Sequence, residues 1–75
     1  MNSNDIKNII AKYAKMNVDN LSDSLDFKKD LHLDSIDLFQ MIMEVEDKYK
    51  IKLNDSDLLS IKTVGDALNK INNAN

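Results

Sequence analysis

Residues 34–50 read DSIDLFQMIMEVEDKYK and give the strongest helix signal in the chain. On a helical wheel at about 100° per residue, the apolar residues of this segment fall on two stripes. The core-facing stripe consists of Leu38, Met41, Ile42, Val45 and Tyr49. The outer stripe consists of Ile36, Phe39 and Met43. Because one stripe is enough to pack a helix on a core, the outer stripe indicates an exposed interaction surface; the alternative is a central helix buried nearly all round.

Polar residues flank the outer stripe, and we call them the polar rim: Asp37, Gln40, Glu44 and Asp47. Residues 30–47 hold six acids and no Lys or Arg, while the rest holds seven acids and ten Lys, so −6 and +3 give the formal charge of −3. An acidic centre argues against nucleic acid binding, which needs clustered positive charge. The acidic centre favours a partner with a basic docking surface, and Phe39 and Met43 are the candidate anchor residues on this chain. The alternative is an acidic face that is only solvated.

Three further segments show helical patterns, at residues 4–16, 55–60 and 64–72. We expect the short segment 55–60 to bury Leu58 and Leu59, and Thr63 to cap the last helix with Asp66 three residues on. Residues 17–33 are a long connection that is too apolar for a free linker, so we expect an ordered loop laid over the helices. The predicted fold is all-α, a small four-helix bundle of three longer helices and one short one, in a single domain over 1–75 with an ordered core at about 4–72.

Composition excludes several classes of protein. The chain has 75 residues, one His and no Cys, so it offers no disulfide, no thiol nucleophile and no multi-His metal site. No apolar run approaches the roughly 20 residues that span a bilayer, and the N-terminus lacks a signal-peptide core. We therefore expect a cytoplasmic, monomeric protein with no bound metal. It is too small to enclose a conventional active site, which argues against an enzyme.

Ser35 is the residue whose position suggests chemistry. Asp34 is placed to cap the central helix, so Ser35 takes the first helical position with its hydroxyl outside the helix. A helix N-terminus carries partial positive charge and free N–H groups, which favour a phosphate ester there. The alternative is an ordinary capping serine. Ser24 lies in the nearly identical DSLD at 23–26, but no sustained helical pattern follows it.

The residues around Ser35 resemble a known family. Residues 30–38, DLHLDSIDL, are similar to the attachment site of acyl carrier proteins, D-L-G-x-D-S-L-D followed by a helix. The resemblance continues through EDKYKIKL at 46–53, NDSD at 54–57 and TVGD at 63–66, in the same order and spacing over about 4–72.

The resemblance implies a discrete carrier that is not itself an enzyme. A separate, magnesium-dependent phosphopantetheinyl transferase (holo-ACP synthase) would attach 4′-phosphopantetheine from coenzyme A to Ser35. The terminal thiol of that arm would carry growing acyl chains as thioesters to fatty-acid synthesis enzymes with basic docking patches. The family's partner contacts fall on Asp34, Ile36, Asp37, Met43, Glu44 and Asp47. Phe39 and Gln40 join them from the outer stripe and the polar rim.

Two departures from the family pattern leave alternatives open. His32 stands where the family usually has Gly, so it must accept a positive φ or the loop must bend differently; it could also lie near the phosphate of the arm. Gln40 replaces a Glu, as in some D-alanyl carriers, so D-alanine, polyketide or aminoacyl units are alternative cargoes. An unmodified acidic helical adaptor is a third hypothesis. A serine hydrolase is remote, because Ser35 has a single His nearby and no Gly-rich oxyanion turn.

Overall fold

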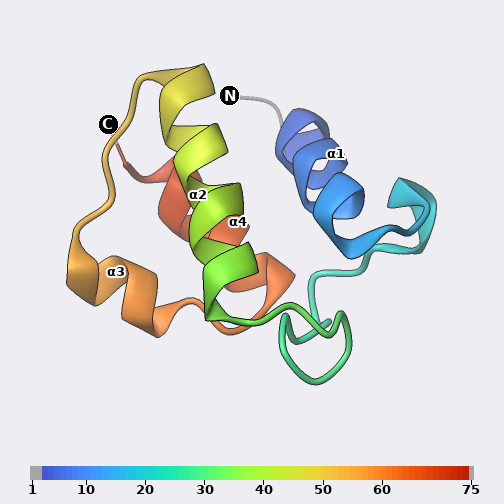
Figure 1. The fold of residues 1–75 in the computed structure, drawn as a ribbon. Coiled ribbons are helices and arrows are strands. Elements are labelled where there is room, and N and C mark those ends of the chain that lie inside the picture. Colours follow the sequence, from blue (N-terminus) through green and yellow to red (C-terminus); the bar gives the residue numbers. More distant parts are fainter. Residues whose placement is uncertain (1–2, 75) are drawn as a thin grey trace.

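The computed structural model describes residues 3–74; residues 1, 2 and 75 of the predicted domain lie outside the described part. Within that range the chain is all-α and contains no named strand, which confirms the predicted fold class (Figure 1). The elements are α1 (Ser3–Ala14), the 3-10 helix η1 (Val18–Asn20), α2 (Ser35–Tyr49), α3 (Asp55–Ser60) and α4 (Val64–Asn72). The bounds of α3 and α4 are as predicted, whereas α1 ends at Ala14 and η1 was not foreseen. None of the helices in residues 3–74 has the length and apolar character needed to cross a membrane.

The core lies where α1 packs against α2 and α4. In Figure 1, α2 crosses in front of α4, α1 lies to one side of the pair and α3 to the other. Ile6 and Ile10 of α1, Met41 of α2 and Ile71 of α4 are completely buried. These residues recur at helical spacing on one face of each helix, so burying that face is what brings the three long helices together.

Local capping sets both ends of α2. The Asp34 carboxylate accepts the N–H of Asp37 at 2.9 Å, and the Asp37 carboxylate accepts the N–H of Asp34 at 3.4 Å. This reciprocal capping box satisfies N–H groups that the first turn leaves without helical partners. At the other end, Lys50 adopts φ 57° and its N–H bonds to the Glu46 carbonyl, which ends the helix in a left-handed turn. Ser35 is therefore the first residue of α2, as predicted.

The loop between η1 and α2 is ordered and pinned to the core, as predicted. Phe27 is 1% exposed, its N–H donates to the Lys62 carbonyl at 2.9 Å and its carbonyl accepts the N–H of Leu33 at 2.8 Å. A second tie joins the N–H of Gly65 to the Asp23 carbonyl at 2.9 Å. A Cβ at residue 65 would lie 3.1 Å from that carbonyl oxygen, so the close approach of loop and α4 favours glycine. These bonds hold the segment before Ser35 against the start of α4.

The expected burial of the α3 leucines is wrong for Leu59 and only partly right for Leu58. Leu59 is 78% exposed, and Leu58 is half-buried against the core. This six-residue helix packs on the core by the side that carries Leu58, so Leu59, about 100° further round the helix, faces solvent. Ile61, just after α3, is 5% exposed and occupies the core instead.

Candidate functional site

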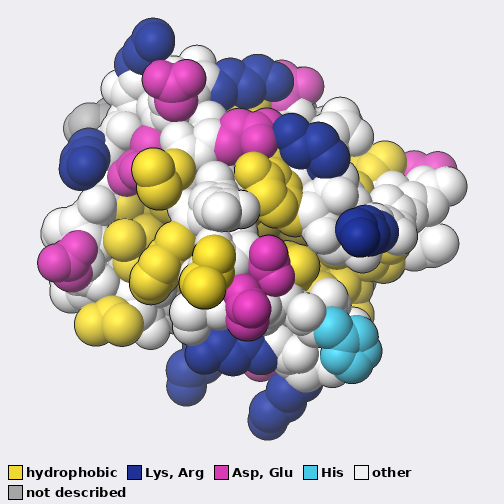
Figure 2. Space-filling view, viewed as in Figure 1, with side chains coloured by type: hydrophobic (Ala, Val, Ile, Leu, Met, Phe, Trp, Pro, Cys, Tyr) yellow, Lys and Arg dark blue, Asp and Glu magenta, His cyan; other side chains and the backbone are white. Residues whose placement is uncertain are grey.

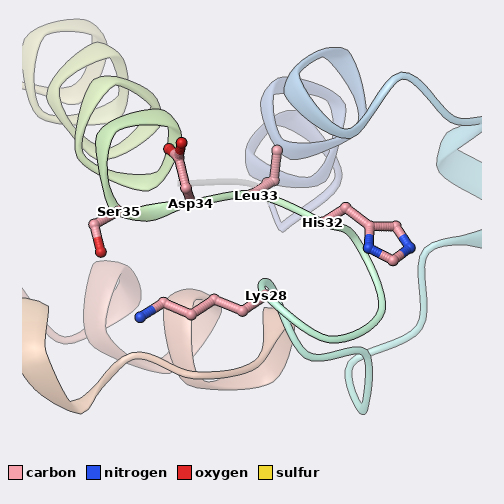
Figure 3. A pocket seen from close by; sticks show the side chains of 5 residues that line it. All are labelled: Lys28, His32, Leu33, Asp34 and Ser35. Atoms are coloured by element: carbon pink, nitrogen blue, oxygen red, sulfur yellow. The ribbon is translucent and has the colours of Figure 1, made fainter.

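Ser35 is exposed at the start of α2, and its hydroxyl points away from the helix (Figure 3). The Ser35 side chain does not cap α2, because the capping side chain is that of Asp34. The first turn of a helix carries partial positive charge, so an anion attached to this hydroxyl is stabilised by the backbone. The position therefore combines access for a modifying enzyme with an environment suited to a phosphate ester.

An open pocket of about 450 Å³ lies beside Ser35, and its lining residues are Lys28, His32, Leu33, Asp34 and Ser35. Figure 3 shows the Lys28 side chain running toward the Ser35 side of the pocket, whereas the His32 ring turns the opposite way. Sequence reasoning missed Lys28, because the loop that brings it next to Ser35 is defined by contacts with α4. The suggestion that His32 lies near a phosphate on Ser35 is not supported by the direction of its ring.

His32 adopts a backbone conformation that glycine would adopt more easily. Its φ is 57°, in the left-handed region where a side chain costs energy. The loop thus keeps the conformation that the family glycine would suit. His32 itself is exposed, and its neighbours Leu31 and Leu33 are buried, so they fix the strained residue from both sides.

Ser24 lies in a different environment, although its tetrapeptide is nearly the same as that of Ser35. It occupies a turn, and its hydroxyl lies 3.2 Å from that of Ser22. No helix begins there, so the backbone offers no helix N-terminus to an attached phosphate. Only the second copy of the motif has the predicted geometry.

The outer stripe of α2 is exposed, as predicted. Ile36, Phe39 and Met43 are 67%, 44% and 64% exposed, while the core-facing stripe is buried apart from half-buried Tyr49. Figure 2 shows hydrophobic side chains gathered on the face that α2 and α3 form, next to acidic side chains. Exposed apolar side chains grouped in this way indicate an interaction surface.

A groove of about 580 Å³ extends this surface from α2 to α3, which sequence reasoning missed. Phe39 and Met43 line it from α2, and Leu53 and Leu58 line it from the chain that follows. The Glu46 side chain accepts the N–H of Leu53 at 2.8 Å and so ties this connection to α2. The helical period of α2 predicts the outer stripe. The six-residue α3 is too short for its sequence pattern to predict that it packs opposite this stripe.

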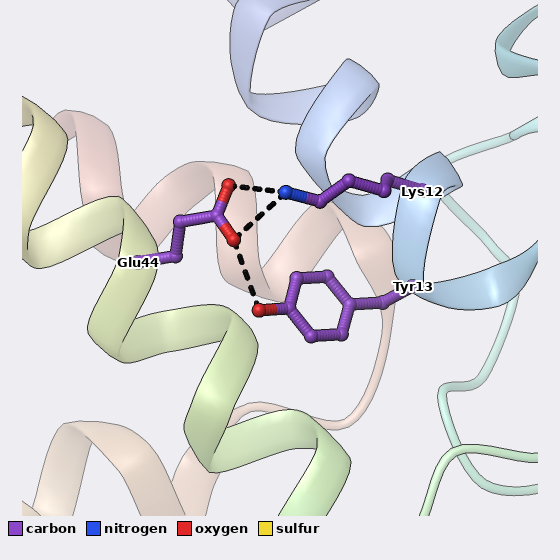
Figure 4. A network of polar contacts seen from close by, with 3 residues as sticks. All are labelled: Lys12, Tyr13 and Glu44. Carbon is purple, nitrogen blue, oxygen red and sulfur yellow. Dashed lines mark hydrogen bonds and ion pairs between the residues drawn. The ribbon is translucent and has the colours of Figure 1, made fainter.

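The members of the polar rim play different roles in the structure. Gln40 and Asp47 are exposed, and Asp37 is part of the α2 capping box. Glu44 instead binds α1: its carboxylate accepts hydrogen bonds from Lys12 Nζ at 2.9 and 2.7 Å and from the Tyr13 hydroxyl at 2.9 Å (Figure 4). The four residues therefore do not form one free acidic edge, and Glu44 lies on the α1 side of α2.

The Glu44 contacts change how three groups titrate. Hydrogen bonds from Lys12 and then Tyr13 hold the pKa of the Glu44 carboxyl below its ordinary value. The same hydrogen bonds raise the pKa of the Lys12 ammonium and of the Tyr13 hydroxyl. The pKa of Glu44 is lower in the folded chain than in the unfolded chain. The network therefore stabilises the fold at pH values above the ordinary pKa of a carboxyl group. That contribution is lost as the pH falls through the lowered pKa.

We expect Glu44→Gln to lower the melting temperature by a few degrees at neutral pH, because it weakens the link between α1 and α2. The difference from wild type should shrink as the pH falls through the lowered pKa of Glu44, where the wild-type carboxylate is also neutralised. Thermal unfolding followed by circular dichroism over a pH series measures this. Asp47→Asn is the matched control, since it removes one charge from an exposed position of the same helix. An equal, pH-independent effect of both variants would contradict the assignment.

Residues 3–74 contain no cluster of His, Asp and Glu suited to a metal ion. Together, these features define a class of protein: a small helical domain that presents an accessible serine at a helix N-terminus, beside an interaction surface.

Comparison with known proteins agrees with this class. Residues 4–71 match the family model described as phosphopantetheine attachment site. An acyl carrier protein of Lactobacillus acidophilus is 38% identical over 68 residues, which cover 91% of this chain and 85% of that protein. The chain belongs to the acyl carrier protein family, the phosphopantetheine-dependent carriers.

Solved structures show the same fold. A candidate acyl carrier protein from Mycobacterium tuberculosis superposes with a TM-score of 0.86 at 30% identity, covering 93% of each chain. An acyl carrier protein from Enterococcus faecalis gives a TM-score of 0.82 at 30% identity, covering 97% of this chain and 92% of that one. The site fits the prosthetic group of the family, because it joins an exposed hydroxyl, a helix N-terminus and the nearby cation Lys28.

Proposed function

We propose that Ser35 is the attachment residue and that the chain carries acyl groups as thioesters for the enzymes of fatty-acid synthesis. The observation that carries the proposal is the exposed Ser35 hydroxyl at the first position of α2, in a chain whose residues 4–71 match the attachment-site family. On modification, Ser35 Oγ bonds to the phosphorus next to pantetheine, the bond to the nucleotide half of coenzyme A breaks, and the hydroxyl proton leaves. The attached group supplies the thiol that the chain lacks.

A second cavity supports an apolar cargo. It has a volume of about 310 Å³ and lies near the start of α2, where its apolar lining consists of Phe27, Leu38, Leu59 and Ile61. An acyl chain loses unfavourable contact with water when it lies against such a lining, whereas a D-alanyl ammonium gains nothing from it. Lys28, Lys29 and Lys62 also border the cavity, together with one acid, Asp26. The lining therefore carries a net positive charge, which disfavours a cationic aminoacyl group.

Intact mass spectrometry tests the proposal directly. After incubation with coenzyme A, Mg²⁺ and a phosphopantetheinyl transferase, we expect the mass to increase by one phosphopantetheine. No increase with a transferase that modifies a control carrier would favour an unmodified adaptor. The mass of the protein isolated from its native host would further distinguish a fatty acyl group from D-alanine, a polyketide or another aminoacyl cargo.

We propose that partner enzymes dock on the outer stripe and on the exposed part of the polar rim. Asp47 is the sharpest probe, because it is exposed and lies in the groove between α2 and α3 without capping a helix. Asp34 and Asp37 are less suitable, since they also cap α2. Glu44 is unsuitable as well, because its charge is paired with Lys12.

We expect Asp47→Lys to weaken binding to a basic partner, such as the transferase, by roughly three- to tenfold at low salt. The loss should diminish at high salt, where exposed charges are screened, and the melting temperature should change little. Asp19→Lys makes the same charge change in η1, on the far side of α1 from α2, and should leave affinity nearly unchanged (Figure 1). Isothermal titration calorimetry at two salt concentrations compares them. Equal losses for both variants would overturn docking at this surface.

A further inference from the structure

The pocket beside Ser35 contains one full positive charge among the described residues that line it, and this charge belongs to Lys28. The other charged residue of the lining, Asp34, directs its carboxylate to the N–H of Asp37. His32 points away from Ser35, while the Lys28 side chain extends toward the side where the Ser35 hydroxyl lies (Figure 3). Lys28 is thus the side chain best placed to meet an anion attached to Ser35.

The base of the Lys28 side chain is held in position by the loop. The Asp26 carboxylate accepts the N–H of Lys28 at 2.8 Å and that of Lys29 at 2.9 Å. The hydrogen bond from the Lys29 backbone has the largest effect on the Asp26 carboxyl and lowers its pKa, and the bond from the Lys28 backbone lowers it further. The charges of the two lysines have a smaller effect in the same direction. Asp26 in turn lies beside buried Phe27, so the turn is anchored in the core.

The ammonium group of Lys28 makes no ion pair with another residue in the range 3–74. Lys28 therefore breaks no existing ion pair when it binds an incoming anion. The phosphodiester that joins the arm to serine carries one negative charge and would stand close to the Asp34 and Asp37 carboxylates. The helix N-terminus offsets part of that repulsion, and a cation at the pocket wall offsets more.

We propose that Lys28 is a positioning residue whose ammonium group pairs with the phosphodiester on Ser35 and holds the base of the arm against the loop. The inference rests on the proposed attachment at Ser35 and adds a contact that depends on this chain's own loop. The pair forms at the surface, so it is sensitive to salt. It restricts the first bonds of the arm and leaves the thiol end free to move.

The test compares the apo and loaded forms of the intact protein. Wild type, Lys28→Gln and Lys29→Gln are first loaded with phosphopantetheine and checked by intact mass. Lys29→Gln is the matched control, because it removes the same charge from the same turn at a residue that does not line the Ser35 pocket. The readouts are the lysine ε-CH₂ signals of the wild type by NMR and the change in melting temperature on loading.

We expect loading to shift the Lys28 ε-CH₂ signal more than that of Lys29. The shift should diminish near 1 M salt, where the Debye length falls to about 3 Å. Loading should raise the melting temperature of wild type and Lys29→Gln, and this rise should be reduced in Lys28→Gln. An unmoved Lys28 signal in loaded wild type, or an equal rise in all three proteins, overturns the inference and leaves attachment at Ser35 intact. Failure of wild type to load overturns the proposed function, and the Lys28 contact with it.

Discussion

Ser35→Ala is expected to abolish the addition of phosphopantetheine completely, because alanine lacks the oxygen that bonds to phosphorus. The fold should be unaffected or slightly stabilised. Ser35 is exposed and does not cap α2, and alanine is the better helix former. Intact mass after incubation with coenzyme A, Mg²⁺ and a transferase measures the effect as loss of the loaded species. Circular dichroism checks that the helices remain.

Ser24→Ala is the matched control for that experiment. Ser24 sits in the similar DSLD tetrapeptide and is also exposed, but it occupies a turn. We therefore expect Ser24→Ala to load to the same extent as wild type. Addition of the group to Ser35→Ala, or its loss in Ser24→Ala, would contradict the assignment of Ser35. Both outcomes are visible in one mass spectrum of each variant.

Phe27→Ala is expected to destabilise the domain by about 3–5 kcal/mol, the usual cost of removing a buried aromatic ring. Phe27 is 1% exposed and anchors the loop that precedes Ser35. A chain of this length has a total stability of roughly 4–11 kcal/mol, so the variant should unfold at a much lower urea concentration than wild type. Urea unfolding followed by circular dichroism measures the free energy of unfolding.

Phe39→Ala separates the two roles of phenylalanine in this chain, which has two such residues. Phe39 is 44% exposed on the outer stripe, so its removal should cost no more than about 1 kcal/mol of stability. It should instead weaken partner binding, since an aromatic anchor of the proposed docking surface is lost. Equal stability losses in Phe27→Ala and Phe39→Ala would contradict this division between core and surface.

The helices could be predicted well because their signals are local. The core-facing and outer stripes of α2 follow from a period of about 3.6 residues, and the caps at Asp34 and Thr63 lie within four residues of the groups they satisfy. The η1 turn was missed, since three residues carry no periodic pattern. Leu59 was misplaced because apolar character alone does not say which of two adjacent leucines faces the core.

The candidate site was predicted in part. The place of Ser35 at the start of a helix follows from Asp34 and Asp37 together with the helical pattern after them, which the DSLD at 23–26 lacks, and the structure has that geometry. The approach of Lys28 depends on the loop folding back on α4. The pairing of Glu44 with Lys12 and Tyr13 joins residues more than thirty positions apart in the sequence. Helical spacing relates only residues a few positions apart, so it could not predict this contact.

Short-range sequence was thus sufficient to determine the bounds of α3 and α4, the two faces of α2 and the place of Ser35, because hydrogen bonds and periodicity act within a few residues. The tertiary structure alone decided which polar groups remain available. Packing α1 on α2 pairs the charge of Glu44 with Lys12 and leaves Asp47 exposed. Pinning the loop on α4 brings Lys28 to the pocket of Ser35. Charges can pair only after the core has set the distances between their helices, since their attraction in water is weak and short in range.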